Sequence, residues 1–505
     1  MIRHAPILPL LIPFAAALLQ MACQRLAVQR WIGTVACAVL LLTSAWLALL
    51  ADDGELRVYA LGDWPAPFGI VLVVDRLAAA MTLLVAILGF ASLLHASAGF
   101  DERGRNFHAL FQLQLFGLTG AFLTGDLFNL FVFFEVMLLA SYTLLAHGGG
   151  VSRTRAGISY VVLNLIGSAL FLIALGLLYG TLGTLNLADV AQRLAQPGYD
   201  PALARLALAL LITVFALKAG LLPLSFWLPP TYTAAGVPVA ALFTIMTKVG
   251  IVAILRLQTT VLAPSLASLL DGWLTTLALA TIAVATLGAL AASRLRTLTA
   301  WLVLLSAGTL LLTPAQASTR VDAAALYYLV HSSLAGAALF LIAGEVASRR
   351  GPAGDRFTAG PLWSGNWLKL GFLVAAMTSV GLPPFSGFVA KLMLLDSLRS
   401  VDGGALIWTV VLVSGLLVML ALARGGCTLV WRQQAIAGEQ PAPATAWQRS
   451  AATLAVVAAG PLLAGLAQPL SGWAMRTATQ LHAPEAYVAG VLGGQPARQT
   501  DKGSR

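Results

Sequence analysis

The sequence has 505 residues, of which 59% are hydrophobic and 10% are charged, and its mean hydropathy is +0.87. Soluble domains contain about one-quarter charged residues, so this composition excludes an ordinary soluble protein. The net charge of +10 does not indicate a nucleic-acid-binding protein, because the basic residues are dispersed among short polar segments.

Apolar stretches follow one another almost end to end, and about 20 apolar residues cross a bilayer as a helix, so we predict an all-α integral membrane protein with about 14 transmembrane helices. The expected helices cover residues 5–23, 30–51, 68–96, 107–124, 127–147, 156–180, 202–222, 237–257, 268–291, 298–315, 321–346, 367–395, 404–431 and 450–473. Arg3 and His4 precede the first apolar run, which lacks a small-residue cleavage site, so we expect a retained helix rather than a removed signal. The polar tail from Gly493 to Arg505 is expected to be disordered.

Basic residues gather on one set of alternate loops, which carries Arg25, Arg30, Arg103, Arg105, Arg153, Arg155, Arg294, Arg296, Arg349, Arg350, Arg356, Lys369, Arg424, Arg432 and Arg449. The other set carries the tail, Arg3, Arg57, Arg193, Arg205, Arg256, Arg320 and Arg399, together with the acidic Asp52, Asp53, Glu55 and Asp63. Lysine and arginine favour cytoplasmic loops. We therefore predict a multi-pass protein of the bacterial cytoplasmic (inner) membrane, with the first set in the cytoplasm and both termini outside.

One short motif occurs twice, in residues 219–227 and 380–388. Glycine, leucine, proline and serine coincide at 220/381, 221/382, 223/384 and 225/386, a constant spacing of 161 residues. This spacing corresponds to about five helices, and an odd-numbered unit inverts in the membrane when it is repeated. Because glycine and proline lie inside both segments, we predict two inverted five-helix repeats with broken helices 7 and 12; a simple proline kink is the alternative. The predicted units are residues 1–106 (helices 1–3), 107–257 (helices 4–8), 258–432 (helices 9–13) and 433–505 (the last helix and the tail).

Three of the five lysines, Lys218, Lys248 and Lys391, fall within apolar segments. A lysine at the centre of a membrane helix costs about 2.5–3.5 kcal/mol on insertion scales. Arginine supplies most of the other positive charge and stays in the loops. Lysine suits a group that must lose and regain a proton, because arginine stays charged. The alternative is that each lysine extends to the membrane interface.

Glu135 lies near the middle of the fifth predicted helix, between aromatic and aliphatic residues. A carboxylate there needs a proton or a cationic partner, and Lys218 is the partner that we predict; a static pair that only fixes helix packing is the alternative. His331 lies mid-helix and is predicted to relay protons between the lysine sites, or else to be a satisfied packing histidine. Glu135, Lys218, Lys248, His331 and Lys391 therefore form the candidate site.

Other polar residues indicate less. Asp75, Asp126 and Asp271 lie near predicted helix ends, where capping is expected, and Glu345 is interpreted as an interfacial carboxylate or an exit group. Cys23, Cys37 and Cys427 have no paired spacing. The sequence has no Walker A motif, dinucleotide fingerprint or cluster of metal ligands, so we expect no cofactor, no metal site and no enzyme.

The run Gly125-Asp-Leu-Phe-Asn-Leu-Phe-Val-Phe-Phe-Glu135, with Ser141-Tyr142 after it, resembles the fifth helix of the antiporter-like membrane subunits. This family is shared by respiratory complex I and the Mrp-type multisubunit cation/proton antiporters. Lys218 with Pro223 and Trp227-Leu-Pro229, then Pro238 through Lys248-Val-Gly250, resembles the seventh and eighth helices, and Gly381 through Lys391 resembles the twelfth. The similarity extends in the same order over residues 5–470, and residues 64–70 look most like the D subunit of the Mrp type.

The resemblance implies that protons pass through Glu135, Lys218, Lys248 and Lys391. It also implies a complex with other membrane subunits in the lipid bilayer, and export of a monovalent cation (Na⁺) driven by proton entry, without nucleic acid. Residues 293–301 depart from the family, which often has an acidic and lysine-containing entry to the tenth helix. Two other functions stay open: a proton-pumping subunit of an NADH:quinone oxidoreductase or membrane-bound hydrogenase, and a solitary solute carrier.

Overall fold

The computed structural model describes residues 2–64, 68–262, 269–270, 272–358, 360–361, 366–431, 433–434 and 446–493. The helices are α1 (Leu8–Ala22), α2 (Leu26–Ala51), α3 (Arg76–Ala96), α4 (Phe107–Leu123), α5 (Leu127–Ala146), α6 (Val151–Leu182), α7 (Leu187–Leu194), α8 (Pro201–Ala219), α9 (Leu228–Ala234), α10 (Val237–Phe243), α11 (Met246–Arg256), α12 (Trp273–Ala291), α13 (Leu295–Leu311), α14 (Thr319–Arg349), α15 (Asn366–Val380), α16 (Ser386–Ser397), α17 (Gly404–Gly426), α18 (Trp447–Gly465), α19 (Ala467–Leu481) and α20 (Pro484–Leu492). The strands are β1 (Arg57–Ala60), β2 (Val71–Val74), β3 (Gly360–Pro361) and β4 (Gln433–Gln434); β1 pairs with β2 antiparallel, and β3 pairs with β4 in parallel.

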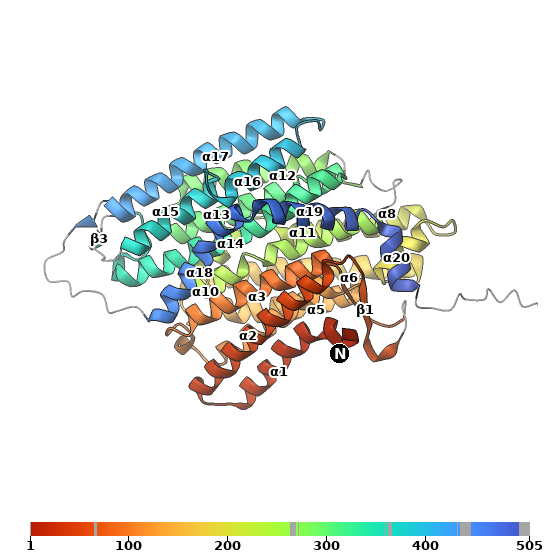
Figure 1. The fold of residues 1–505 in the computed structure, drawn as a ribbon, viewed down its shortest axis with the longest axis horizontal. Coiled ribbons are helices and arrows are strands. Elements are labelled where there is room, and N and C mark those ends of the chain that lie inside the picture. The colour runs from red at the N-terminus through yellow and green to blue at the C-terminus, as the bar shows by residue number, and fades with distance from the viewer. Residues whose placement is uncertain are drawn as a thin grey trace, which may run out of the picture.

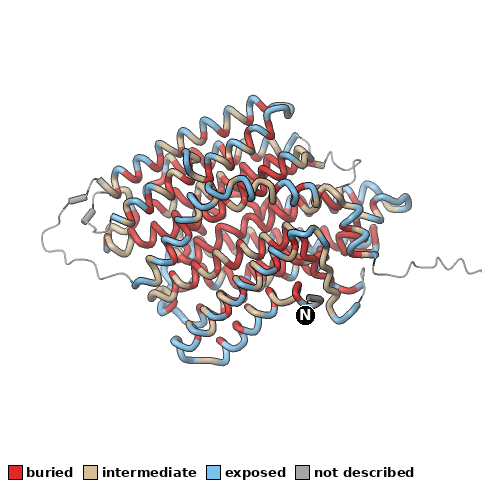
Figure 2. Tube along the Cα trace, in the orientation of Figure 1, coloured by how far each residue is buried: buried red, intermediate tan, exposed pale blue. Residues whose placement is uncertain are grey.

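Long helices lie side by side through the molecule, with α1 and α2 at one edge and α17 at the opposite edge (Figure 1). Helix α14 lies in the middle and packs against α10, α13, α15, α16, α18 and α19. Buried residues concentrate in the central helices, whereas α1, α2 and α17 each expose a face (Figure 2). These exposed faces are apolar, as expected where a protein meets lipid or another membrane subunit.

Among the described residues, 11 helical segments are long and apolar enough to cross a membrane, or 12 if α18 and α19, which bend by 82° at their junction, form one span. The predicted count of about 14 is therefore not confirmed. Helix α4 is apolar but has only 17 residues. The predicted span 367–395 is divided into α15 and α16. Apolar sequence continues across such interruptions, so hydropathy alone does not reveal them.

The prediction of one helix over residues 68–96 is wrong at its start. Strand β2 occupies Val71–Val74, and α3 begins only at Arg76. Four consecutive β-branched or aliphatic residues favour the strand, and the Asp75 carboxylate accepts a hydrogen bond from Ala78 N at 2.7 Å to cap the helix. The expectation that Asp75 and Asp126 are caps is confirmed, since Asp126 accepts from Asn129 N at 2.9 Å; Asp271 lies outside the described residues.

The first broken helix stops where the glycine of the repeated motif takes a left-handed conformation. Helix α8 ends at Ala219, and Gly220 has φ of 86°, a value that costs glycine little. Leu221 N then donates to Ala216 O at 2.9 Å, which closes the helix end. The chain resumes as α9 at Leu228, and Thr281 of α12 accepts the free Leu222 N at 3.0 Å.

The second break repeats this geometry. Helix α15 ends at Val380, Gly381 has φ of 88°, and Leu382 N donates to Met377 O at 3.0 Å. Each of these residues lies 161 positions after its counterpart, and so do the prolines of the two cis peptide bonds, Leu222–Pro223 and Pro383–Pro384. Both helices therefore stop and restart, which confirms the predicted breaks and excludes a simple kink.

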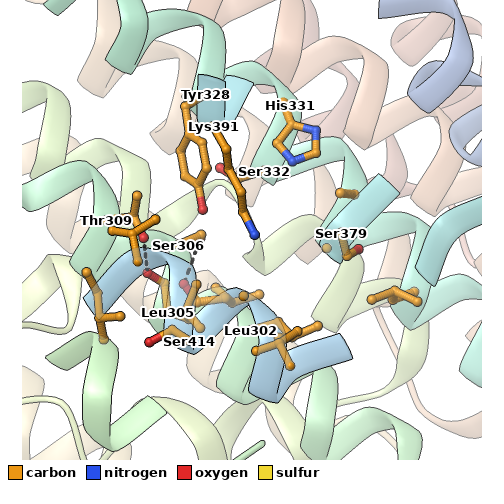
Figure 3. Close-up of a pocket in the computed structure, with 18 residues that line it drawn as sticks. Leu302, Leu305, Ser306, Thr309, Tyr328, His331, Ser332, Ser379, Lys391 and Ser414 are labelled. Carbon is orange, nitrogen blue, oxygen red and sulfur yellow. Dashed lines mark hydrogen bonds between the residues drawn. The ribbon is translucent and has the colours of Figure 1, made fainter. Parts of the chain in front are cut away.

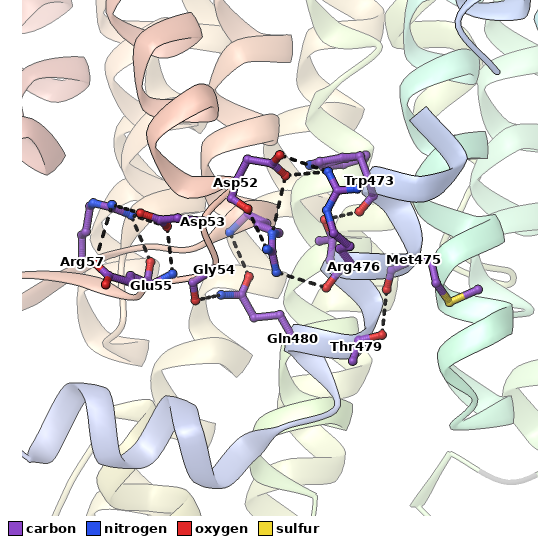
Figure 4. A network of polar contacts seen from close by, with 12 residues as sticks. Asp52, Asp53, Gly54, Glu55, Arg57, Trp473, Met475, Arg476, Thr479 and Gln480 are labelled. Carbon is purple, nitrogen blue, oxygen red and sulfur yellow. Dashed lines mark hydrogen bonds and ion pairs between the residues drawn. The ribbon is translucent and has the colours of Figure 1, made fainter. Parts of the chain in front are cut away.

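The two ends of the described chain meet one element. The 3₁₀ helix Ile2–Ile7 and α20 both pack against β1. Beside them, Arg476 of α19 binds the Asp52 carboxylate at 2.8 Å, Arg76 donates to the Asp52 carbonyl at 2.7 Å, and Gln480 donates to the Gly54 carbonyl at 2.9 Å (Figure 4). This network fastens the C-terminal helices to the N-terminal half.

Candidate functional site

Helix α6 lies between α5 and α8 and provides a polar partner to each. The Ser168 hydroxyl donates to the Glu135 carboxylate. One helical turn away, the Asn164 carbonyl Oδ1 accepts from Lys218 Nζ at 3.2 Å. In the part of the chain that the structure describes, no ion pair joins Glu135 to Lys218. The predicted direct pair is therefore not formed, because each group finds its partner on the intervening helix.

The surroundings of Lys218 are closely packed. Its side chain is 4% exposed, and its ammonium lies 5.9 Å from the centre of the Phe134 ring. A Cβ on Gly250 of α11 would lie 2.5 Å from the Phe215 carbonyl of α8, so the two helices touch through their backbones. This packing holds the ammonium beside a neutral amide and an aromatic ring.

Lys248 lies one helix further along the chain of contacts, on α11 beside α8. It is fully buried, and its Nζ donates to Ser306 Oγ of α13 at 3.0 Å. The Ser306 hydroxyl in turn donates to Val303 O at 2.7 Å. A hydroxyl can both donate and accept, so Ser306 accommodates Lys248 with or without its extra proton.

His331 and Lys391 meet at the second break. His331 of α14 is 3% exposed, and its Nδ1 hydrogen-bonds Ser386 Oγ at 3.0 Å, at the first residue of α16. Lys391 is half-buried, and its Nζ donates to Val380 O at 2.6 Å. That carbonyl is the last one of α15, where the partial negative charge of a helix C-terminus favours a cation.

A small cavity connects these groups. It offers about 40 Å³ to the centres of water molecules, which is enough for a few waters. Ser306, Tyr328, His331, Ser332 and Lys391 line it, and the Lys391 ammonium points into it (Figure 3). The partner of Lys248 and the groups at the second break therefore share one polar space.

The structure thus places the five predicted residues in two groups. Glu135 and Lys218 are linked through α6, whereas His331 and Lys391 share the cavity that Ser306 connects to Lys248. Sequence reasoning missed the neutral partners Asn164, Ser168, Ser306 and Ser386. A usable signal existed for two of them, because Asn164 and Ser168 are four residues apart in the otherwise apolar stretch 161–178 of α6 and therefore share a face.

Three other buried carboxylates form ion pairs with arginines. Asp75 binds Arg256, Asp101 binds Arg30 at 2.7 Å, and Glu345 binds Arg349 at 3.2 Å. Asp101 lies outside the membrane-spanning helices; burial opposes its ionisation, but Arg30 and His108 bring its pKa down to about 2. Such ion pairs fix the charged state, which is typical of structural groups.

Residues 124–417 match the protein family described as NADH:quinone oxidoreductase/Mrp antiporter, TM. The chain belongs to this family. The D subunit of a probable K(+)/H(+) antiporter from Rhizobium meliloti (strain 1021) is 41% identical to this chain over 471 residues, covering 85% of this chain and 87% of the relative. The D subunit of an Na(+)/H(+) antiporter from Bacillus subtilis (strain 168) is 34% identical, covering 96% and 99%.

Solved structures agree with this assignment. A chain of the Mrp complex from Dietzia sp. DQ12-45-1b superposes with a TM-score of 0.85 at 25% identity, covering 97% of this chain and 99% of that chain. A chain of respiratory complex I from Thermus thermophilus superposes with a TM-score of 0.76 at 26% identity, covering 95% and 100%. The predicted membership of the antiporter-like family is confirmed, and so is the helical membrane fold, which four short strands accompany.

Proposed function

We propose that this chain is the D-type subunit of a multisubunit monovalent-cation/proton antiporter, and that protons cross it through Glu135, Lys218, Lys248, His331 and Lys391. One observation carries the proposal. Each of these five ionisable groups is held by a neutral partner: Ser168, Asn164, Ser306, Ser386 and the Val380 carbonyl, respectively. A neutral partner does not commit a group to one protonation state, whereas an ion pair does.

The order of contacts supports one path through these residues. Helix α6 links Glu135 to Lys218, and α8 packs against α11, which carries Lys248. Ser306 leads from Lys248 into the cavity that His331 and Lys391 line. Waters in that cavity would move protons between the last groups, since hydroxyls and waters both donate and accept.

The exposed apolar face of α5 suits contact with another membrane subunit. Phe128, Val132 and Leu139 are 45%, 38% and 63% exposed and lie on the same stripe of α5 as Glu135. A carboxylate at this edge is costly against lipid. A neighbouring subunit on this face would cover Glu135 and deliver protons to it.

The membrane orientation belongs to the same proposal. We place the arginine-rich loops in the cytoplasm of a bacterium and both termini outside. Both ends of the described chain contact β1, which supports placing the two termini on the same side of the membrane. The twin breaks support residues 107–257 and 258–432 as the two inverted repeats, flanked by residues 1–106 and 433–505.

Na⁺ and K⁺ are the candidate cations, because the relatives are named for one or the other. The redox alternative keeps one observation in its favour, the likeness to complex I. Purification of the tagged chain from its host separates the two functions: small antiporter subunits support the proposal, and flavin and iron–sulfur proteins contradict it.

The proton path is tested in everted vesicles that contain the assembled complex, by cation-dependent change of the pH gradient. Glu135→Ala and Lys218→Ala should each leave assembly intact and stop transport. Lys369→Ala, in the first turn of α15 and outside the path, is the matched control and should transport at the wild-type rate. Wild-type transport by an assembled Glu135→Ala/Lys218→Ala double variant would contradict the path.

A further inference from the structure

A second polar cavity lies away from the proton path, at the end of the molecule that carries the arginine-rich loops. It measures about 310 Å³. The end of α3, the starts of α6, α13 and α18, and the region of Gly344 in α14 form its walls. Among the described residues that line it are four arginines and no carboxylate; the arginines are Arg103, Arg153, Arg296 and Arg449.

Three of these arginines lie at helix N-termini, and at one of them, α13, the Asp355 carboxylate accepts a hydrogen bond from Arg296 N at 2.9 Å and offsets the positive charge. Arg153, Arg296 and Arg449 lie in the first turns of α6, α13 and α18, and none of these turns contains an acidic residue. The helix N-terminus carries partial positive charge, so a cation there is disfavoured and an anion is favoured. Loop arginines that only orient the chain in the membrane do not need to converge on one cavity.

Two of these four arginines have a carboxylate within 4 Å, and two, the exposed Arg103 and the half-buried Arg153, have none among the described residues. Arg296 pairs with Asp355 at 3.2 Å, and Arg449 lies 3.9 Å from Glu345. Arg153 reaches only carbonyls, donating to Ala234 O at 3.2 Å. Arg103 stacks on the Phe100 ring at 5.5 Å, and among the described residues it forms no ion pair.

His95 supplies an independent sign of a missing ligand. It belongs to α3, lines the cavity and is 3% exposed, yet neither ring nitrogen has a hydrogen-bond partner among the residues that the structure describes. The Nε of Arg449, on the same cavity, lies 3.9 Å from a Glu345 carboxylate oxygen and forms no hydrogen bond within the described part of the chain. Buried polar atoms are almost always satisfied, so the ring nitrogens of His95 favour a polar ligand in the cavity.

We propose that this cavity binds a phosphate group, either the headgroup of an anionic phospholipid or a free phosphate. The guanidinium forks of Arg103 and Arg153 match phosphate oxygens, and His95 donates a further hydrogen bond. Basic pockets between membrane helices on the cytoplasmic side suit such headgroups. Transport is not needed as a readout, so this inference is tested separately from the proton path.

The test uses the purified complex in mild detergent and compares two double variants. Arg103→Gln/Arg153→Gln removes two cavity arginines, and Arg105→Gln/Arg155→Gln removes two exposed arginines from the same segments that do not line the cavity. Phosphatidylglycerol is titrated into phosphatidylcholine micelles while the thermal midpoint is measured. Sodium phosphate is titrated separately against sodium chloride at equal ionic strength.

We expect the ligand concentration at half-saturation to rise about 30-fold in the cavity variant, because each arginine near an anionic surface raises the affinity about 5-fold. In the control variant this concentration should stay unchanged. Protection by phosphatidylglycerol alone assigns a lipid headgroup, and protection by sodium phosphate as well assigns a free phosphate. Equal weakening in both variants, or no protection by either ligand, overturns the proposal. If the cavity variant does not assemble, Arg103→Lys/Arg153→Lys keeps the charge but loses the fork, and an unchanged half-saturation there overturns it too.

Discussion

The broken helix around Gly220 and the one around Gly381 follow the same backbone path but carry their lysines on different sides of the break. Lys218 lies just before the first break, inside α8, and donates to a side chain on another helix. Lys391 lies after the second break, in α16, and donates back across it to the Val380 carbonyl. The repeated motif therefore fixes the shape of the break, and the position of the cation is chosen separately in each half.

The two halves also differ in their packing. Gly250 lets α11 touch the backbone of α8 beside Lys218. In the second half, Lys391 and α17 both line a cavity with room for a few waters. A lysine in close packing depends on one side chain for its hydrogen bond, whereas a lysine beside a cavity can hydrogen-bond to water instead. This difference predicts which substitutions each half tolerates.

Alanine at Gly250 in the first half and at Gly415 in the second should give the largest difference in stability between the two halves. In Gly250→Ala the new Cβ would lie 2.5 Å from the Phe215 carbonyl and 2.9 Å from Ala219 N, so α8 and α11 must move apart. We expect a loss of about 3 kcal/mol in stability, at the upper end for overpacking. In Gly415→Ala of α17 the Cβ meets only the mobile Lys391 ammonium, at 3.5 Å. Thermal unfolding of the purified complex should show a lowered midpoint for the first variant alone; equal midpoints would contradict the difference in packing.

Alanine at the glycines of the two breaks should give a smaller contrast. Both glycines have positive φ, which costs another residue about 1–2 kcal/mol. At Gly381 the added Cβ also lies 2.9 Å from Lys391 Cδ and 3.1 Å from the Gly387 carbonyl, whereas at Gly220 it meets only leucine methyl groups, at 3.1 and 3.2 Å. Gly381→Ala should therefore lower the unfolding midpoint more than Gly220→Ala. The reverse order would mean that the second break has more freedom to adjust than its packing indicates.

Replacing Asn164, the partner of Lys218, should have a smaller effect, on transport. Asn164→Leu keeps the volume of the buried side chain but removes the Oδ1 acceptor, and one backbone contact at 3.5 Å remains. We expect cation-dependent proton transport to fall about tenfold, which corresponds to the loss of one hydrogen bond to a charged group. Asn164→Asp supplies a fixed counter-charge instead and should also slow transport, because the lysine then keeps its proton. Full activity in both variants would remove Asn164 from the path.

The sequence predicted much of this fold for physical reasons. Hydropathy located the apolar helices, and the paired glycines and prolines located both breaks, because few residues adopt the required backbone conformation. Hydropathy did not separate β2 from α3, since a run of valine and leucine suits a strand and a membrane helix alike. It also did not reveal the 82° bend between α18 and α19.

The ionisable members of the site were predictable for a related reason: lysine, glutamate and histidine are rare in apolar helices, and their cost makes them conspicuous. Their partners were not predictable, because serine and asparagine are tolerated in many membrane helices and only the packing decides which of them faces a lysine. Asn164 enters the site because α6 lies between α5 and α8, and Ser306 enters because α13 lies beside α11. These are properties of the folded arrangement.

The smallest expected effect belongs to Ser306, and it tests the role of water in the second half. Ser306→Ala removes the acceptor of Lys248 Nζ at the edge of the cavity. A water in the enlarged space can replace the hydroxyl at little cost in energy, so transport should fall only about two- to threefold. Ser306→Val fills that space and should lower the transport rate about tenfold, because the replacement water is excluded. A large loss in the alanine variant, equal to the loss in valine, would show that Lys248 depends on one fixed side chain as Lys218 does, and the two halves would then work alike.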